Sequence, residues 1–244
     1  MERPVYKARR ELFNRMDIPV TKADVRILKL KQRARLVFWE GMLRGLLVVK
    51  RIFDIVLSLT AIIVLAPVFA LVALAVLIED GFPVIYSQKR VGLNGREFRF
   101  YKFRSMVNGA EKMKMDLEAR NESGDGVTFK MKDDPRVLRS GRITRRFSLD
   151  EIPQFFNVLL GDLSVVGPRP PLPEEVKTYS LNDRKRLHVK PGLTCLWQIG
   201  GRSEIPFSEQ VGLDMQYIQS QSLLKDIVIM LKTVPAVLFG RGAY

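Results

Sequence analysis

The sequence predicts a mostly helical α+β protein that inserts one helix into a membrane and carries a small β-hairpin. Three features of the 244-residue chain lead to this fold class. Residues 55–78 form an uncharged apolar run, residues 83–106 alternate around a tight-turn signal, and residues 148–160 and 213–239 have helical spacing. The first is long enough for a membrane helix, the second is typical of a hairpin, and the last two are typical of amphipathic helices.

Pro67 lies at the midpoint of the apolar run. A straight helix of this length would measure about 36 Å, enough to cross a hydrocarbon core of about 30 Å. Proline removes a helix hydrogen bond, so a kink is expected at Ala66 and Pro67. Basic residues flank the run on both sides, whereas a spanning helix usually has them mainly on one side. A re-entrant helix that enters and leaves the same leaflet fits better, with Asp54 at its entry paired to Lys50 or Arg51.

The segment before the apolar run is strongly basic. Residues 1–51 contain 14 Lys/Arg and 5 Asp/Glu, a net charge of +9 out of the chain's +14. From Val25 to Val49, apolar and basic residues follow each other at roughly helical spacing around Phe38 and Trp39. This pattern is typical of an amphipathic helix on an anionic membrane surface. The alternative is a solvated helix packed on its own domain.

A β-hairpin is predicted around Asn94-Gly95, which separates two alternating runs. Phe100 and Lys102 would share one face of the second strand. Lys102 and Arg104 lie at its end. Their charged side chains either lie in solvent at the strand end or add cations to a binding site.

The main chemical signal lies between Ser148 and Pro173. Ser148 and Glu151 have the spacing of a capping box, so a helix is expected to begin at Ser148 and to end near Gly161. Asp150 and Glu151 would lie in its first turn, where the helix dipole favours negative charge. A stiff Gly-Pro-Arg-Pro-Pro turn then holds Arg169. A carboxylate pair facing an arginine can hold a divalent cation and a phosphate; the alternative is an ordinary helix start.

The other segments are assigned from local patterns. Residues 108–120 are expected to be helical, 121–132 a loop of the kind that forms lids, and 174–190 largely helical. Residues 193–202 read as a short strand into a Gly-Gly loop, and residues 213–239 as one amphipathic stretch that Pro235 breaks. Four arginines precede Ser148 and form either a solvated basic face or part of a site: Arg139, Arg142, Arg145 and Arg146.

Composition narrows the classes of function. A sequence pI of about 10.1 admits nucleic acid, anionic lipid and phosphorylated substrates as partners. Cys195 is the one cysteine, so no intrachain disulfide forms, which fits a reducing, cytosol-facing location. His188 is the one histidine, which argues against a zinc site and against a His-based triad.

Several stretches together resemble the bacterial sugar transferases of the monotopic phosphoglycosyl transferase family. They are residues 50–58, the apolar run with Pro67, and residues 88–106, 133–170, 190–202 and 223–234. Residues 1–45 lie outside the match. Two small departures are Ala66, where the family often has serine, and Cys195, where it usually has glycine.

The resemblance implies an architecture of three parts. Residues 1–49 would form the basic amphipathic segment, 50–80 the re-entrant helix bent at Pro67, and 81–244 a cytosolic catalytic domain with a C-terminal interfacial helix. Such a protein would be monotopic in the bacterial cytoplasmic (inner) membrane, on anionic lipid, with its catalytic domain facing the cytoplasm. A homo-oligomer is left open.

The resemblance also implies a reaction that initiates the synthesis of an exopolysaccharide, O-antigen, capsule or glycoconjugate. A UDP-sugar would give its sugar-1-phosphate to undecaprenyl phosphate and release UMP, with Mg2+ and a covalent aspartyl-phosphosugar intermediate. Asp150 matches the nucleophile, and Glu151 with Asp150 would hold the metal. The predicted phosphate-binding residues are Lys102, Arg104, Arg146, Arg169 and Arg202.

Two other classes of function are weighed against this one. A basic nucleic-acid-binding protein would explain the pI, but an uncharged apolar run argues against nucleic acid as a partner. A non-catalytic membrane-anchored scaffold would explain the anchor. It would need neither the acidic pair nor Lys102 and Arg169.

Overall fold

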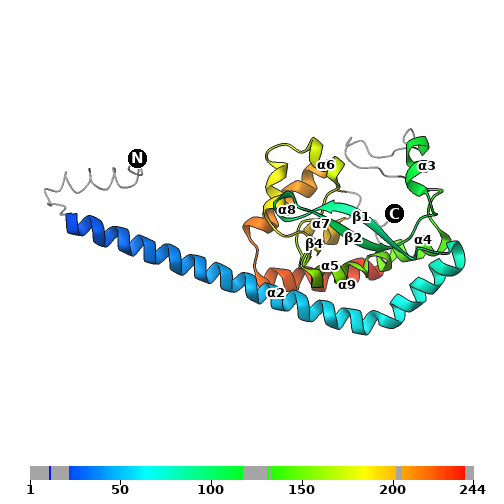
Figure 1. The fold of residues 1–244 in the computed structure, drawn as a ribbon, viewed down its shortest axis with the longest axis horizontal. Helices are drawn as coiled ribbons and strands as arrows, with labels where there is room; N and C mark the ends of the chain where they lie inside the picture. Colours follow the sequence, from blue (N-terminus) through cyan, green and yellow to red (C-terminus); the bar gives the residue numbers. More distant parts are fainter. Residues whose placement is uncertain (1–10, 12–21, 118–130, 132, 202–204, 240–244) are drawn as a thin grey trace. The chain divides into compact units, whose positions relative to one another are not determined.

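The computed structural model describes residue 11 and residues 22–117, 131, 133–201 and 205–239. It shows a mostly helical protein with two small two-stranded sheets and one long apolar helix near the N-terminus (Figure 1). The chain divides into two compact units, residues 1–50 and 51–244. Both sheets and every predicted site residue belong to the second unit.

Helix α2 runs from Lys22 to Asp80 and contains Pro67. Figure 1 shows a bend in the part of α2 coloured cyan, to which Pro67 belongs, in agreement with the expected kink. Within the described ranges, one helix is long and apolar enough to cross a membrane by length and composition, and only 11% of its most apolar window is buried in the protein.

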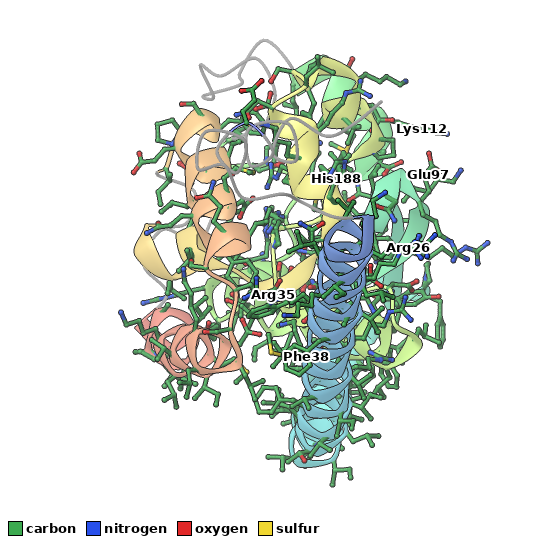
Figure 2. The ribbon with its side chains drawn as sticks, turned by 90° about the vertical axis from the view of Figure 1, so that its left-hand side faces the viewer. Arg26, Arg35, Phe38, Glu97, Lys112 and His188 are labelled. Atoms are coloured by element: carbon green, nitrogen blue, oxygen red, sulfur yellow. The ribbon has the colours of Figure 1, made fainter. Side chains whose placement is uncertain are left out.

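The N-terminal half of α2 exposes apolar and basic side chains together. Val37, Phe38 and Trp39 are each more than half exposed. Figure 2 shows Arg26, Arg35 and Phe38 projecting outward from this helix. The mixture predicted from the sequence is therefore present on an exposed helix surface.

The predicted hairpin is confirmed. Strand β1 (Ile85–Val91) pairs antiparallel with β2 (Glu97–Phe103). The connection contains the short 3-10 helix η1 (Leu93–Gly95), where Asn94 and Gly95 have φ of 56° and 81°. These left-handed values explain why Asn-Gly suits the turn.

A second, parallel sheet joins two segments far apart in the sequence. Strand β3 (Ser164–Val166) pairs with β4 (Gly192–Thr194). The main core packs β3 against β2, α5 (Gln154–Leu160), α8 (Phe207–Gln219) and α9 (Leu223–Phe239), with Val158, Leu163 and Ile229 at 0–1% exposure. The strand β2 and the helix α5, which carry or adjoin the predicted site residues, are therefore part of the main core.

The α2 helix is bonded to this core at both ends of its apolar run. Arg51 donates to the carbonyls of Val158 and Leu159 at 2.5 and 2.8 Å. Asp54, 3% exposed, accepts from Ser164 Oγ and the Val165 N–H at 3.1 and 3.0 Å. The sequence analysis pairs Asp54 with Lys50 or Arg51; of these, Arg51 is bonded to the core, as is Asp54.

The far end of α2 is bonded as well. Glu79 accepts from the N–H groups of Arg139 and Ser140 at 2.7 and 2.9 Å, at the start of α4 (Arg139–Arg146). Hydrogen bonding to Ser140 is the largest effect on the pKa of Glu79; together with the Arg139 N–H it lowers this pKa, against the effect of burial. An anionic oxygen at free helix N–H groups is a favourable arrangement.

The capping-box prediction is wrong. Ser148 has φ of 52° and its side chain caps no helix; residues Leu149–Glu151 form a 3-10 turn, η3, and α5 begins only after Pro153. The left-handed Ser148 turns the chain between α4 and η3, which a capping serine in extended conformation would not do. The predicted end at Gly161 is correct, with φ of 92°.

Two further predictions need correction. Residues Leu196–Gly200 form helix α7 and not a strand continuation. The stretch 213–239 is divided between α8 and α9, and Pro235 lies inside α9 without ending it. Helices α3 (Ala110–Leu117) and α6 (Pro173–Thr178) and the 3-10 helix η4 (Asp183–His188) fall in segments predicted to be helical. Apart from Met131, the predicted loop 121–132 lies outside the described residues.

Candidate active site

A cavity of about 870 Å3 lies within the second unit. Side chains from α2, the hairpin strands β1 and β2, η3, α7, α8 and α9 line this cavity, together with the proline-rich turn at Arg169. One part is apolar, with Leu57 and Leu65 of α2 and Met230, Val234 and Leu238 of α9. Another part carries charged side chains, among them Lys102, Asp150, Glu151 and Arg169. The cavity can therefore take a ligand with an apolar and an anionic portion.

Asp150 and Glu151 lie on η3, with Lys102 beside both. Lys102 Nζ lies 2.7 Å from Glu151 Oε1 and 3.6 Å from Asp150 Oδ2. The side chains of Asp150 and Glu151 are 9% and 18% exposed. One ammonium group thus contacts two largely buried carboxylates from adjacent positions.

The two carboxyl groups respond to this setting in opposite directions. Burial raises the pKa of Asp150, although Lys102 opposes it, and the negative charge of Glu151 adds to the increase. Burial also acts on Glu151, but Lys102 and Arg169 outweigh it and lower the pKa of Glu151 to about 2. Adjacent carboxyl groups with divergent pKa values are typical of catalytic pairs. Burial of Asp150 thus opposes the effect of the helix dipole, which the sequence analysis expects to favour negative charge at this position.

Hydrogen bonds between helix α5 and strand β2 fix the position of Lys102. It lies in β2, whose edge is held by Asn157 of α5, a fully buried residue. Asn157 Oδ1 accepts from the Tyr101 N–H at 3.0 Å, and Nδ2 donates to the Arg99 carbonyl at 2.6 Å. The helix that follows the acidic pair is therefore bonded directly to the strand that carries Lys102.

Arg169 reaches the same pair from the proline-rich turn. Its Nη1 lies 3.9 Å from Glu151 Oε1, and its guanidinium carbon lies 5.9 Å from the centre of the Trp197 ring. The turn packs against the start of β4 so closely that a Cβ on Gly192 would lie 2.0 Å from the Gly167 nitrogen. Only glycine fits there, and the close contact fixes the backbone that carries Arg169.

Among the described residues, four other arginines line the cavity: Arg90, Arg136, Arg145 and Arg186. Arg145, on α4, lowers the pKa of Asp150 through its charge. Arg90 is buried and donates to the Pro170 carbonyl and to Gln88, and burial together with the charge of Arg169 lowers its pKa to about 10. Arg186 is paired with Asp214. The sequence analysis places Arg145 either on a solvated basic face or in a site, and no local signal assigns the other three to the site.

Some predicted phosphate-binding residues lie elsewhere. Arg104 is buried against the end of α2, where Nη2 contacts Asp80 Oδ2 at 3.0 Å and donates to the carbonyls of Asp80 and Gly81. Arg146 is exposed, with its guanidinium 5.6 Å from the centre of the Phe147 ring. Neither lines the cavity. Arg202 lies outside the described residues.

The acidic pair fits Mg2+ only as a partial ligand set. Among the described residues no cluster of three or more His, Cys, Asp or Glu could hold a metal. Mg2+ is typically held by one or two carboxylates together with substrate phosphates and water. Asp150 and Glu151 could supply two carboxylates to such a site, and Lys102 Nζ contacts both of them.

Known proteins share this framework. Residues 46–240 match the family described as bacterial sugar transferase. The chain is 47% identical over 198 residues to the galactosyl transferase CpsE of Streptococcus agalactiae, a match that covers 81% of this chain and 44% of that protein. It is 40% identical over 198 residues to the exopolysaccharide production protein ExoY of Sinorhizobium fredii, covering 80% and 88%.

A third relative is named for a lipid-linked reaction. The undecaprenyl-phosphate galactose phosphotransferase of Salmonella typhimurium is 41% identical over 198 residues, covering 80% of this chain and 41% of that protein. The chain thus spans less than half of two of these relatives and most of the third. The family match extends over the whole site and both sheets. The chain belongs to the bacterial sugar transferase family.

Proposed function

We propose that this protein transfers a sugar-1-phosphate from a UDP-sugar to undecaprenyl phosphate, which yields undecaprenyl-diphosphate-sugar and UMP and initiates a surface polysaccharide. The observation that carries the proposal is the placement of Lys102 between Asp150 and Glu151 on the cavity wall. The printed name of the Salmonella relative, which includes undecaprenyl phosphate, supports the same acceptor.

The first half of the reaction uses Asp150 as nucleophile. An ionised Asp150 oxygen attacks the β-phosphorus of the UDP-sugar; the new bond joins Asp150 to that phosphorus, and its bond to the bridging oxygen breaks. UMP leaves with the bridging oxygen and its electron pair. Covalent catalysis divides one difficult transfer into two easier ones.

The second half regenerates the carboxylate. A phosphate oxygen of undecaprenyl phosphate attacks the same phosphorus, and the bond to Asp150 breaks. Lys102 and Arg169 provide fixed positive charge where negative charge develops on the transferred phosphoryl group. The apolar wall of α2 and α9 supports an acceptor with a hydrocarbon chain.

Asp150 and Glu151, with the substrate phosphates, would hold Mg2+, which offsets charge on the diphosphate. The ligand role of Glu151 is consistent with its low pKa, since it remains ionised across the neutral range. The localisation that follows is a monotopic protein on the cytoplasmic face of the bacterial inner membrane. One long apolar helix supports it.

The decisive experiment follows UMP release from UDP-galactose in the presence of undecaprenyl phosphate. Asp150→Asn should lower the rate by at least about 1,000-fold and abolish the trapped phosphosugar adduct, because an amide is a poor nucleophile. Asp116→Asn, an exposed residue on α3, is the matched control and should retain full activity. An adduct on Asp150→Asn would remove Asp150 as nucleophile.

Glu151 is tested separately. Glu151→Gln should weaken the Mg2+ dependence and the rate together, because the amide keeps one oxygen ligand but loses the charge. The measurement is a Mg2+ titration of UMP release. An unchanged titration would place the metal elsewhere.

A further inference from the structure

The cavity continues past Arg169 to a wall that the proposed chemistry does not use. We call it the aromatic wall; it consists of Tyr179, Arg186, Trp197 and Phe207. The rings of Tyr179 and Phe207 lie 5.4 Å apart, and the Arg186 guanidinium lies 5.8 and 5.9 Å from their centres. Three aromatic side chains and one cation thus line one part of the cavity.

Buried bonds hold this wall in place. Arg186 pairs with Asp214 and also donates to the Tyr179 hydroxyl at 3.2 Å. In the part of the chain that the structure describes, Nε of Arg186 and Nε1 of Trp197 are buried donors without a hydrogen-bond partner. Oδ1 of Asp214, on the carboxylate that pairs with Arg186, is an unpaired acceptor. Buried donors are normally paired, so the aromatic wall fits a ligand that brings oxygen acceptors.

The position of Arg169 relates this wall to the acidic pair. Arg169 lies 3.9 Å from Glu151 and 5.9 Å from Trp197, so one guanidinium separates the reacting carboxylates from the aromatic wall. In a UDP-sugar the α-phosphate likewise separates the reacting β-phosphate from the nucleoside. The sugar, in contrast, is bonded directly to the β-phosphate.

A different part of the cavity adjoins the acidic pair through Arg145. The charge of Arg145 lowers the pKa of both Asp150 and Asp134. Asp134 and Arg136, which also line the cavity, form a buried pair with Nη2 and Oδ2 2.6 Å apart. This region of the cavity therefore offers charged side chains on the Arg145 side of the acidic pair.

We infer that the donor binds with its uracil against the aromatic wall, its α-phosphate at Arg169 and its sugar on the Arg145 side. The inference rests on the proposed function, because it orients the donor of that reaction. Aromatic rings stack on any base, and the two carbonyl oxygens of uracil provide acceptors for the two unpaired donors. The reverse orientation, with the sugar on the aromatic wall, is the competing outcome.

The chain allows a direct spectroscopic test. Its two tryptophans are Trp39 and Trp197, so Trp39→Phe leaves Trp197 as the sole tryptophan fluorophore. The full-length Trp39→Phe protein is titrated with UMP and, separately, with galactose 1-phosphate. UMP should change the Trp197 fluorescence in a saturable way, and galactose 1-phosphate should not. A saturable response to galactose 1-phosphate alone would overturn the orientation.

A kinetic variant provides a second measurement. Phe207→Leu removes a stacking ring and should raise both the inhibition constant of UMP and the KM for UDP-galactose about fivefold or more, with kcat within about twofold. Phe98→Leu removes the same ring from a half-buried site outside the cavity and serves as the folding control. Unchanged UMP inhibition in Phe207→Leu would contradict the inference.

The two proposals fail in different ways. If the wild-type protein releases no UMP from any UDP-sugar supplied, the proposed function fails. If it releases UMP while UMP leaves both Trp197 fluorescence and the Phe207→Leu inhibition constant unaffected, the proposed function stands and the donor orientation is wrong.

Discussion

In the proposed reaction Asp150 must lose its proton before it can attack, and burial, which raises the pKa of Asp150, moves this step to higher pH. Arg145 lowers that pKa through its charge. Replacing Arg145 with Gln should therefore raise the pKa of Asp150 further. The acid limb of kcat/KM should move to higher pH, so that activity falls more at pH 6 than at pH 8.

Arg142→Gln is the matched control, because Arg142 lies on the same helix and is exposed. Its pH profile should coincide with that of the wild type. The measurement is UMP release across pH 5–9 at subsaturating UDP-galactose. A profile of Arg145→Gln that is lowered uniformly, without displacement, would show that Arg145 does not act on Asp150 by charge.

Substitution of Arg169 tests whether phosphate binding needs the planar guanidinium group or only its positive charge. Arg169→Lys keeps the charge but loses the planar pair of donors and the contact with the Trp197 ring. It should lower kcat/KM by about 10-fold or more, within the range of about 1.5–3 kcal/mol for bonds to charged groups. Arg99→Lys, an exposed change on β2, should have no such effect. Equal activity of both variants would make Arg169 a structural residue.

The sequence predicts some site residues better than others for a physical reason. Asp150 and Glu151 are adjacent, and the prolines around Arg169 restrict its backbone, so local sequence already limits where these groups lie. Arg104 has the same charge as Lys102 and lies two positions further on, yet it is bonded to Asp80 at the end of α2. Only the tertiary fold decides which cation of the strand reaches the cavity.

At the scale of elements, Asn157 joins α5 to β2 and thereby joins the acidic pair to Lys102. Its side chain is fully buried and makes bonds to the backbone on either side of Phe100, at Arg99 and Tyr101. Asn157→Ala leaves two part-buried backbone groups unpaired. It should lower the free energy of unfolding by about 2–6 kcal/mol, at about 1–3 kcal/mol for each group.

Activity should fall together with stability in Asn157→Ala, because Lys102 loses its support. Asn182→Ala removes an exposed amide that accepts only from Lys185 and should change the free energy of unfolding by less than about 0.5 kcal/mol. Chemical denaturation monitored by circular dichroism measures both variants. A stable Asn157→Ala protein with normal activity would show that β2 needs no bond from α5.

Local signals also explain which elements were predicted. The hairpin depends on Asn94-Gly95 and on alternation, both of which are local, and it is correct. The capping box at Ser148 failed because the left-handed Ser148 and Pro153 allow only a 3-10 turn before α5 begins. The sequence predicts that Pro235 breaks its helix, but α9 continues past Pro235 to Phe239. The parallel pairing of β3 with β4 has no local signal, because residues 164–166 and 192–194 meet only in the folded chain.

At the scale of the whole molecule, apolar side chains remain exposed on more than one element of the second unit. On α2 they include Ile63 and Val64, at 72% and 67% exposure, and on α9 they include Leu224 and Leu231, at 78% and 67%. Exposed apolar surfaces of this kind mark contacts with membranes or other proteins. The uncharged part of α2, residues 55–78, favours a membrane as the partner. Pro67 removes one backbone hydrogen bond of the helix, and this favours a bent helix over a straight spanning one.

The re-entrant arrangement makes a topological prediction that a spanning helix cannot share. Both ends of residues 55–78 should lie on the cytoplasmic side, because in the proposed reaction the site reaches a nucleotide sugar in the cytosol and a lipid phosphate at the headgroups. In a Cys195→Ser background, single cysteines replace Gly45 before the run and the exposed Lys89 after it. In spheroplasts, both should resist a membrane-impermeant thiol reagent until the membrane is opened. Pro67→Leu should straighten the helix and expose one of the two cysteines to the reagent. Labelling of either cysteine in the Pro67 protein before the membrane is opened would establish a spanning helix instead.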